Sequence, residues 1–254
     1  MKAQSRSSSI PIKPSRPAPR RPAAARWSNA RVLRELKLLA NPRIRKKMTY
    51  FGVRVPKAFG ISTPLLHAFA RRIGKNHQLA GQVWSSGIHE ARILAALIAE
   101  EDKVTPQQME RWARDFDAWD VVDACCCYLY AAASPAWQKA ESWSRRPEEF
   151  VKRAAFSLVA YLAYKDKQAS DARFERFLRV IEREAHDERN FVRKAVNWAL
   201  RNIGKRNLLL NRAAIRVAER IRRQNSRSAR WIAADALREL QSKAVRVRLR
   251  RKAL

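Results

Sequence analysis

The sequence predicts an all-α fold, a helical-repeat solenoid with a concave basic groove, and three observations support this class. Apolar residues recur at helical spacing through most of the 254 residues, and no stretch alternates as a β-strand does. Short blocks of sequence recur at fixed offsets. The chain also carries 54 Lys and Arg against 23 Asp and Glu, a formal net charge of +31.

The order of helices follows from their start and stop signals. A first helix is expected from near Trp27 until Pro42 ends it. Three later helices are expected where a hydroxyl residue precedes proline, because that residue caps the helix and proline suits its first turn: Thr63-Pro64, Thr105-Pro106 and Ser134-Pro135. Further helices are expected over residues 88–101, 118–131, 148–164, 170–186, 189–203, 208–224 and 227–240.

An internal repeat organises the second half of the chain. Phe150-Val151-Lys152-Arg153-Ala154 recurs 41 residues later as Phe191-Val192-Arg193-Lys194-Ala195, and Trp198-Ala199-Leu200-Arg201 recurs 37 residues later as Asp235-Ala236-Leu237-Arg238. Helix pairs of this period are typical of a HEAT-like solenoid, although chance similarity among Ala- and Arg-rich amphipathic helices is an alternative. Basic residues near the start of each second helix would line the concave side of such a solenoid.

Charge and composition divide the chain into three parts. Residues 1–25, rich in Pro, Arg and Ser, are expected to be a disordered basic arm, residues 26–240 the folded domain and residues 241–254 a basic C-terminal tail. Residues 87–149 differ, since they hold 12 acidic and seven basic residues. The large positive charge favours a polyanionic partner, and nucleic acid is the first candidate.

Several classes of protein are disfavoured. Six glycines in the whole chain leave no Gly-rich phosphate loop. Cys125–Cys127 fan out by about 100° each around a helix, so they cannot form a metal-ligand face or a disulfide with one another, and we expect them to be buried small apolar residues. The four histidines are scattered, so no cofactor and no metal site is expected. No run of 18 apolar residues and no secretory signal is present, so we expect a cytoplasmic protein.

Asp123 is the first candidate for chemistry. It lies four residues after Trp119, on the same helical face, and opens an otherwise apolar helix. Burying a carboxylate there is costly without a purpose or a partner. The structural alternative is that Asp123 pairs with an arginine and Trp119 only packs.

Five blocks of sequence together resemble the HEAT-like DNA alkylation repair glycosylases, the AlkD-type enzymes, over residues 50–240. They are Phe59-Gly60-Ile61-Ser62-Thr63-Pro64, Trp84 with His89-Glu90, Trp119-Asp120-Val121-Val122-Asp123, Phe150-Val151-Lys152-Arg153-Ala154-Ala155 and Phe191-Val192-Arg193-Lys194-Ala195-Val196-Asn197-Trp198-Ala199-Leu200-Arg201. Each block alone is weak, but their order and distances are jointly specific.

The resemblance implies a fold, a reaction and site residues. The catalytic carboxylate of the family falls on Asp123, its two cleft tryptophans on Trp119 and Trp198, and its supporting arginine on Arg153. The reaction implied is hydrolysis of the N-glycosidic bond of cationic alkylpurines such as 3-methyladenine and 7-methylguanine in double-stranded DNA. It needs no metal, and the expected protein is a monomer associated with the bacterial nucleoid.

Basic residues outside the catalytic set are expected to bind the DNA backbone. This set is Lys152, Arg193, Lys194, Arg71, Arg72 and Arg230. An alternative function from another class is a non-catalytic HEAT-like module that binds damaged or branched DNA, or structured RNA, through the same groove. Retention of Trp119, Asp123, Arg153 and Trp198 together favours the enzyme.

Overall fold

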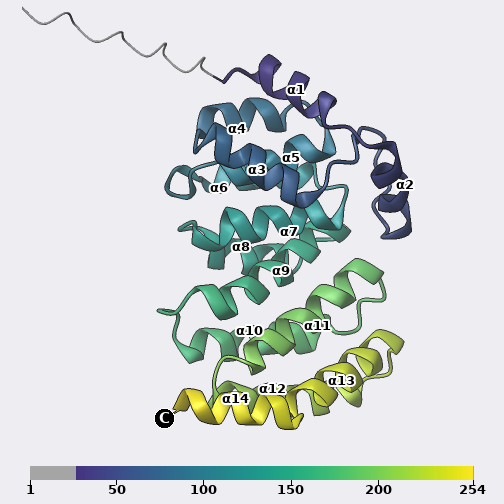
Figure 1. Ribbon diagram of the computed structural model, residues 1–254. Coiled ribbons are helices and arrows are strands. Elements are labelled where there is room, and N and C mark those ends of the chain that lie inside the picture. The colour runs from purple at the N-terminus through teal and green to yellow at the C-terminus, as the bar shows by residue number, and fades with distance from the viewer. Residues whose placement is uncertain (1–26, 254) are drawn as a thin grey trace, which may run out of the picture.

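The computed structural model describes residues 27–253, and the regular secondary structure within that range is entirely helical (Figure 1). The predicted arm at residues 1–25 lies outside the described range. The helices are α1 Asn29–Leu38, α2 Pro42–Tyr50, α3 Thr63–Ile73, α4 His77–Trp84, α5 His89–Ile98, α6 Pro106–Arg114, α7 Trp119–Tyr128, α8 Ala136–Trp143, α9 Glu149–Lys165, α10 Asp171–Glu184, α11 Asn190–Gly204, α12 Leu208–Arg222, α13 Arg227–Leu240 and α14 Lys243–Ala253, with 3₁₀ turns η1 Glu101–Lys103 and η2 Tyr130–Ala132.

The predicted helix starts are confirmed in one case and shifted in two. Thr105 is the N-cap of α6, and its hydroxyl accepts a hydrogen bond from the Gln108 N–H at 3.1 Å. At α3 the N-cap is Ser62, one residue before the predicted Thr63. At α8 the helix begins only at Ala136, so Ser134 lies outside it and makes no cap. The seven helices predicted over residues 88–240 agree with the structure within three residues at each end.

Three helices were not predicted, and each has a weak sequence signal. Asn41 and Asn76 cap α2 and α4 by accepting hydrogen bonds from backbone N–H groups in the first turn. No residue of α2 is fully buried, and Ile44 and Met48 alone give it only a short apolar stripe. The predicted C-terminal tail instead forms α14, which packs on α12 and α13 because Val245 and Leu249 turn inward.

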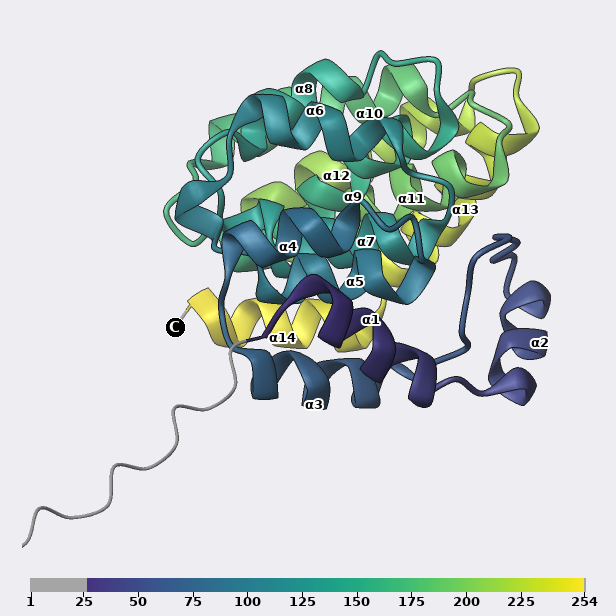
Figure 2. The same cartoon turned by 90° about the horizontal axis from the view of Figure 1, so that it is seen from above.

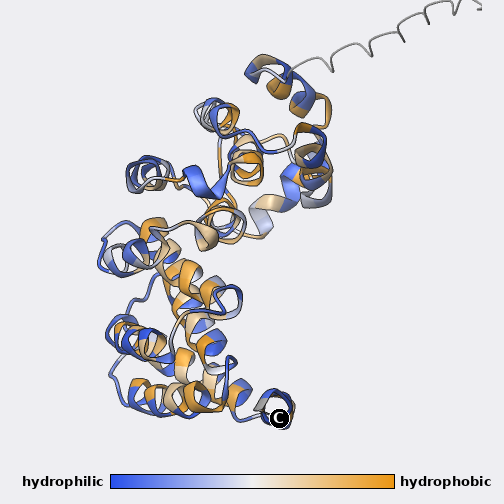
Figure 3. Ribbon diagram, turned by 90° about the vertical axis from the view of Figure 1, so that its left-hand side faces the viewer, coloured by the Kyte–Doolittle hydropathy of each residue, from blue (hydrophilic) through white to orange (hydrophobic). Residues whose placement is uncertain are grey.

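Two layers of helices build the molecule. An inner layer runs through α5, α7, α9, α11 and α13, each packed against the next, and α4, α6, α8, α10 and α12 form the outer layer. Figure 3 shows the stack as an arc, with the N-terminal helices at one end and the C-terminus at the other. Large apolar side chains fill the stack, among them Trp143, Tyr130, Phe156, Phe174 and Phe177. No helix in the described range is long and apolar enough to span a bilayer.

Polar contacts repeat at the predicted period. The Asn197 amide donates to Asp235 at 2.7 Å, and Arg201 donates to Glu239 at 2.6 Å, each across 38 residues. Both bonds join α11 to α13, whose sequences carry the matching blocks. The predicted repeat is therefore confirmed as a structural unit.

The segment between α2 and α3 is held by one buried carboxylate. The backbone N–H groups of Phe59, Gly60 and Ile61 donate to Glu90 at 2.9, 2.6 and 3.3 Å. Gly60 has a positive φ of 78°, and a Cβ there would come within 2.3 Å of the Asn41 carbonyl oxygen. This close approach fixes α2, which Figure 2 shows standing apart from the two layers.

Candidate functional site

Asp123 and Arg153 form a bidentate ion pair between α7 and α9. The Arg153 Nε and Nη2 atoms donate to the two Asp123 oxygens at 3.2 and 2.7 Å, and the Ser157 hydroxyl donates to one of them at 2.9 Å. Arg153 also donates to the Phe191 carbonyl of α11 at 2.9 Å. Three inner helices thereby fix one carboxylate, whose side chain keeps 17% of its surface exposed.

The electrostatics of this pair are opposed. Burial raises the pKa of Asp123, whereas the charge and the N–H groups of Arg153, together with the Ser157 hydroxyl, act to lower it. A bidentate guanidinium favours the ionised carboxylate. Burial outweighs these contacts, so the pKa of Asp123 is raised overall, and Arg153 is the main group that favours the ionised form.

Trp119 lies beside this pair and is tied to the end of α2. The Arg153 guanidinium stands over the indole, 5.7 Å from the ring centroid. The indole N–H donates to the Phe51 carbonyl at 3.0 Å, and the neighbouring Gly52 lies against the ring of Phe191. The residues after α2 therefore reach both α7 and α11.

Trp198 joins the site through a residue that was not predicted. Its ring meets Tyr161 of α9 edge-on, with centroids 4.9 Å apart. Burial, and then the negative charge of Asp123, raise the pKa of Tyr161, so this phenol belongs to the same electrostatic environment. Arg153, Ser157 and Tyr161 follow one another at four-residue spacing on α9. That stripe beside the predicted Arg153 was the signal by which Ser157 and Tyr161 could have been found.

Three predicted backbone-binding residues gather at the starts of α11 and α13. Lys194 and Arg230 are exposed, and the Arg193 guanidinium lies 5.1 Å from the ring centroid of Trp231. Helix N-termini attract anions. These side chains therefore form a basic, aromatic patch at the same end of the inner helices as Asp123.

Arg71 and Arg72 lie at the opposite end of the arc, in the last turn of α3. Arg72 pairs with Glu35 at 3.0 Å and packs over Trp27, so its side chain is part of the contact between α1 and α3. Arg71 is exposed. One turn before Arg71, a ring nitrogen of His67 hydrogen-bonds the Tyr128 hydroxyl of α7 at 3.1 Å, which places this face of α3 beside the inner layer.

Lys152 does not lie where a DNA phosphate could reach it, and we correct this prediction. Its side chain is buried, and its ammonium pairs with Glu184 at 2.5 Å and with Asp187 at 3.1 Å. On α9 its neighbour Arg153 points about 100° away, toward Asp123. Lys152 therefore joins α9 to α10.

The Lys152 cluster gives a pH-dependent stability. Burial raises the pKa of Asp187, but hydrogen bonds from Arg189 and Lys152 outweigh it and lower that pKa to about 2. The native state therefore gains stability above about pH 4 that is lost as the pH falls through 2. We expect Asp187→Asn to reduce the free energy of unfolding by about 2 kcal/mol at neutral pH, and by about half as much at pH 3.

Urea unfolding at the two pH values measures this difference. Glu175→Gln, on the exposed face of α10, removes the same charge and is the control. An Asp187→Asn defect that stayed constant between pH 7 and pH 3 would contradict the role of the charge.

The remaining candidates for chemistry contribute packing. Cys125 and Cys126 are buried, and burial raises the pKa of both thiols, while Cys127 is half-buried. The Trp84 ring is buried and stacks on Trp112 with centroids 4.0 Å apart. In the described range no three His, Cys, Asp or Glu side chains gather as metal ligands would.

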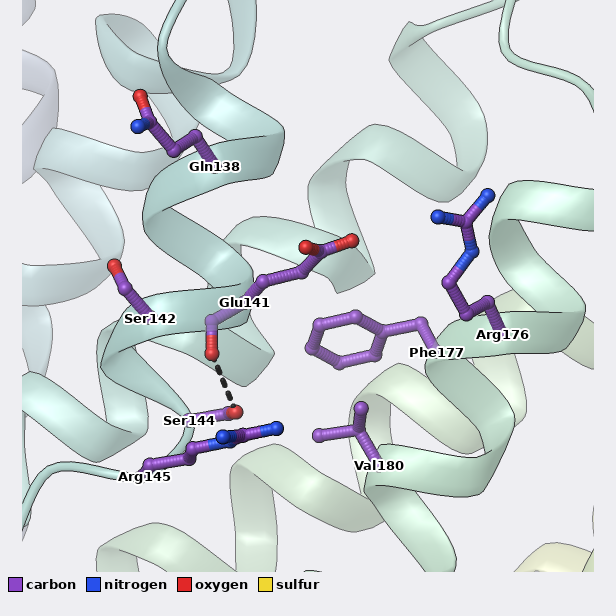
Figure 4. Close-up of a pocket in the computed structure, with 8 residues that line it drawn as sticks. All are labelled: Gln138, Glu141, Ser142, Ser144, Arg145, Arg176, Phe177 and Val180. Atoms are coloured by element: carbon purple, nitrogen blue, oxygen red, sulfur yellow. Dashed lines mark hydrogen bonds between the residues drawn. The ribbon is translucent and has the colours of Figure 1, made fainter.

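One cavity of about 630 Å³ lies in the outer layer, away from Asp123. Phe177 and Val180 of α10 face Glu141 and Ser144 of the α8 region across it, and the Ser144 hydroxyl donates to the Glu141 carbonyl at 2.8 Å (Figure 4). The Asp123–Arg153 ion pair lies instead on the inner layer, among Trp119, Tyr161 and Trp198. We therefore take that inner-layer cluster as the candidate functional site.

Comparisons with known proteins agree with this architecture. A search of curated proteins found no match. A solved structure described as "a new family of proteins related to the HEAT-like repeat DNA glycosylases with affinity for branched DNA structures" matches with a TM-score of 0.71 and 21% identity, over 84% of this chain and 96% of that chain. At that identity it shows the fold, and the predicted HEAT-like solenoid is confirmed. The family model for DNA alkylation repair enzymes matches residues 32–240, so the chain belongs to the DNA alkylation repair enzyme family.

Proposed function

We propose that this protein is a monofunctional DNA glycosylase that hydrolyses the N-glycosidic bond of cationic alkylpurines in double-stranded DNA, for base excision repair. The observation that carries the proposal is the Asp123 carboxylate, held by Arg153 and Ser157 among Trp119, Tyr161 and Trp198. The lesions we propose are 3-methyladenine and 7-methylguanine, and the protein would act as a cytoplasmic monomer.

The chemistry suits these residues. Alkylation at N3 or N7 gives the purine a positive charge and makes it a good leaving group, so the barrier lies in the positive charge that develops on the sugar. An ionised Asp123 stabilises that charge and orients a water molecule for attack. The indole faces of Trp119 and Trp198 offer a cationic nucleotide contacts of about 0.5–2 kcal/mol each.

Arg153 acts as a positioning residue in this scheme. Its bond to the Phe191 carbonyl fixes the guanidinium, and the guanidinium fixes both oxygens of Asp123. The carboxylate thus needs little reorganisation when charge develops, which is the condition for strong electrostatic stabilisation.

Release of methylated bases tests the proposal directly. Duplex DNA treated with a methylating agent is incubated with excess protein, and free 3-methyladenine and 7-methylguanine are measured. We expect release of both bases and an intact strand until alkali cleaves the abasic sites. Binding of the duplex without release of either base would reject the glycosylase.

A second candidate is a non-catalytic DNA-binding protein. The observation that favours it is that both Asp123 oxygens are already occupied by Arg153 and Ser157, as in a purely structural ion pair. The similar solved structure is described as having affinity for branched DNA. A four-way junction bound more tightly than a duplex of equal length, with no base release, is the result that would select this candidate.

The basic patch on α11 supports a prediction common to both candidates. Replacing Arg193 and Lys194 by Ala should weaken binding to all duplex sequences alike, because phosphate contacts position a protein without specifying sequence. We expect the slope of log affinity against log salt to fall by roughly two units, one for each phosphate that the variant no longer neutralises. Fluorescence anisotropy over a salt series gives both quantities.

Arg111→Ala with Arg114→Ala is the matched control, since both arginines are exposed on α6 in the outer layer. It removes the same charge from outside the patch. Equal reductions of affinity in the two double variants would mean that net charge alone, and not this patch, governs binding.

A further inference from the structure

A second cavity lies far from Asp123 along the inner helices. It has a volume of about 620 Å³ and is formed by the C-terminal ends of α9 and α11, the connection to α10 and one face of α14. Lys167 on its wall is 14 residues beyond Arg153, so at 1.5 Å per residue the two lie roughly 20 Å apart along the direction of α9. Figures 1 and 2 both show α14 on the side of the arc opposite α2.

The lining of this cavity is strongly basic. Five cationic side chains surround it, and Asp171 is its one acidic residue: Lys167, Lys205, Arg206, Arg248 and Lys252. A cavity with this excess of one charge attracts an anionic ligand.

Two of these cations are already used by the fold. Arg206 donates to the carbonyls of Ala163, Asp166 and Ala169 at 3.1, 2.8 and 2.9 Å, and so closes the C-terminal end of α9. Lys205 pairs with Glu239 at 2.7 Å.

Three cations remain without an acidic partner in the described part of the chain, and of these Arg248 donates only a long hydrogen bond of 3.5 Å to the Lys205 carbonyl: Lys167, Arg248 and Lys252. The pKa of Lys252 is lowered, first by burial and then by repulsion from the positive charges of Arg248, Lys167 and Arg206. An anion placed among these side chains would relieve the repulsion.

An aromatic side chain identifies the kind of anion. Tyr164 lines the same cavity and is 46% exposed, and its ring packs edge-on against Tyr161 with centroids 5.8 Å apart. Cations beside an exposed aromatic ring are the combination by which proteins hold single strands, since the phosphates meet the charges and a base stacks on the ring. The bases of an intact duplex are paired inside and offer no free face.

We propose that this cavity binds a single-stranded segment of DNA that leaves a duplex lying on the inner layer. Lys167, Arg248 and Lys252 hold its phosphates, and Tyr164 stacks on one base. The inference rests on the DNA-binding role proposed above but not on base release, since the three cations lie outside the Asp123 cluster and the cavity touches that cluster only where Tyr164 packs on Tyr161.

Binding of tailed DNA tests the site. The full-length protein is titrated by fluorescence anisotropy against a blunt duplex, and against the same duplex carrying a single-stranded tail of about 12 nucleotides. We expect the wild-type protein to bind the tailed duplex more than about fivefold more tightly, since one stacked base alone gives about that gain and the phosphate contacts add to it. In Lys167→Gln with Arg248→Gln and Lys252→Gln, the preference for the tailed duplex should fall to the share that stacking on Tyr164 supplies.

The salt dependence of the affinity separates the contribution of the three cations from that of base stacking. For the tailed duplex, the salt slope of the triple variant should be smaller by roughly two units, since three phosphates of a single strand contribute about 0.7 each. Tyr164→Ala should keep the slope and bind about fivefold more weakly. The matched control is Arg111→Gln with Arg114→Gln and Arg179→Gln, three exposed arginines of the outer layer.

Three results would overturn the site. They are equal wild-type affinities for the blunt and tailed duplexes, the same reduction of affinity in the control variant, and a loss of blunt-duplex binding in the triple variant. Binding of oligothymidine alone tests the cavity separately from the proposed binding of duplex DNA on the inner layer. If the protein binds no duplex but binds oligothymidine through these three cations, the groove is rejected and the cavity retained.

Discussion

Asp123→Asn should lower single-turnover release of 7-methylguanine by a factor on the order of 10²–10³, the scale of removing one electrostatic stabiliser. Asparagine keeps the shape and one acceptor for Arg153, but it removes the charge that opposes the cation developing on the sugar. DNA affinity should stay constant or rise, because the repulsion between a carboxylate and the phosphates is relieved. Base release, thermal melting and DNA affinity are measured on one preparation.

The ion pair complicates this variant, because Arg153 is buried and loses its charged partner. We therefore expect a lower melting temperature, and the rates are compared where melting shows both proteins to be folded. Asp117→Asn is the control, since it neutralises a half-exposed carboxylate just before α7 and should retain full activity. Full activity in folded Asp123→Asn would exclude Asp123 from the mechanism.

Gly60→Ala should be strongly destabilising. Its φ of 78° strains any L side chain, and the new Cβ would lie 2.3 Å from the Asn41 carbonyl oxygen and 2.5 Å from the Arg45 nitrogen. Both are backbone atoms at the start of α2, so the segment must shift. We expect a loss of about 3–4 kcal/mol, the sum of the conformational strain and the overpacking.

A comparison with Gly74→Ala separates the steric clash from the backbone strain. It has nearly the same φ, 77°, yet nothing lies within 4 Å of a Cβ placed there. Its ψ of −177° places it in a backbone region used almost only by glycine, so Gly74→Ala should cost about 1–3 kcal/mol from strain alone, without the added clash. If urea unfolding gave the two variants equal stabilities, the close approach of Gly60 to α2 would carry no energetic weight.

Helices α9 and α11 were predictable because residues 148–164 and 189–203 each begin with the same block and are rich in apolar residues. Helix α11 buries one face, whereas α9 is buried on nearly every side from Val151 to Ala160. Helix α2 could not be found in this way, since it buries no residue, and its start lies against Gly60 in a segment that the more distant Glu90 holds in place. Local patterns do not report such contacts.

The candidate site was predictable only in part. The juxtaposition of Asp123 with Arg153 came from a resemblance, and the structure brings the two together at 2.7 Å. The role of Lys152 was predicted wrongly because adjacent residues on a helix point in different directions, and its acidic partners Glu184 and Asp187 lie on and just after α10. Which of two neighbouring cations faces the groove depends on that packing.

The tie between the end of α2 and the later helices changes how the array folds. In a solenoid each repeat touches only its neighbours, so repeats can form and melt one after another. Here the Phe51 carbonyl holds Trp119, and Gly52 lies against Phe191, a residue separated from it by more than half of the chain. Closing so long a loop slows folding, since its entropy is lost before the two ends meet. Because the same contacts join the N-terminal helices to α7 and α11, we expect the first and later repeats to unfold together and not one after another.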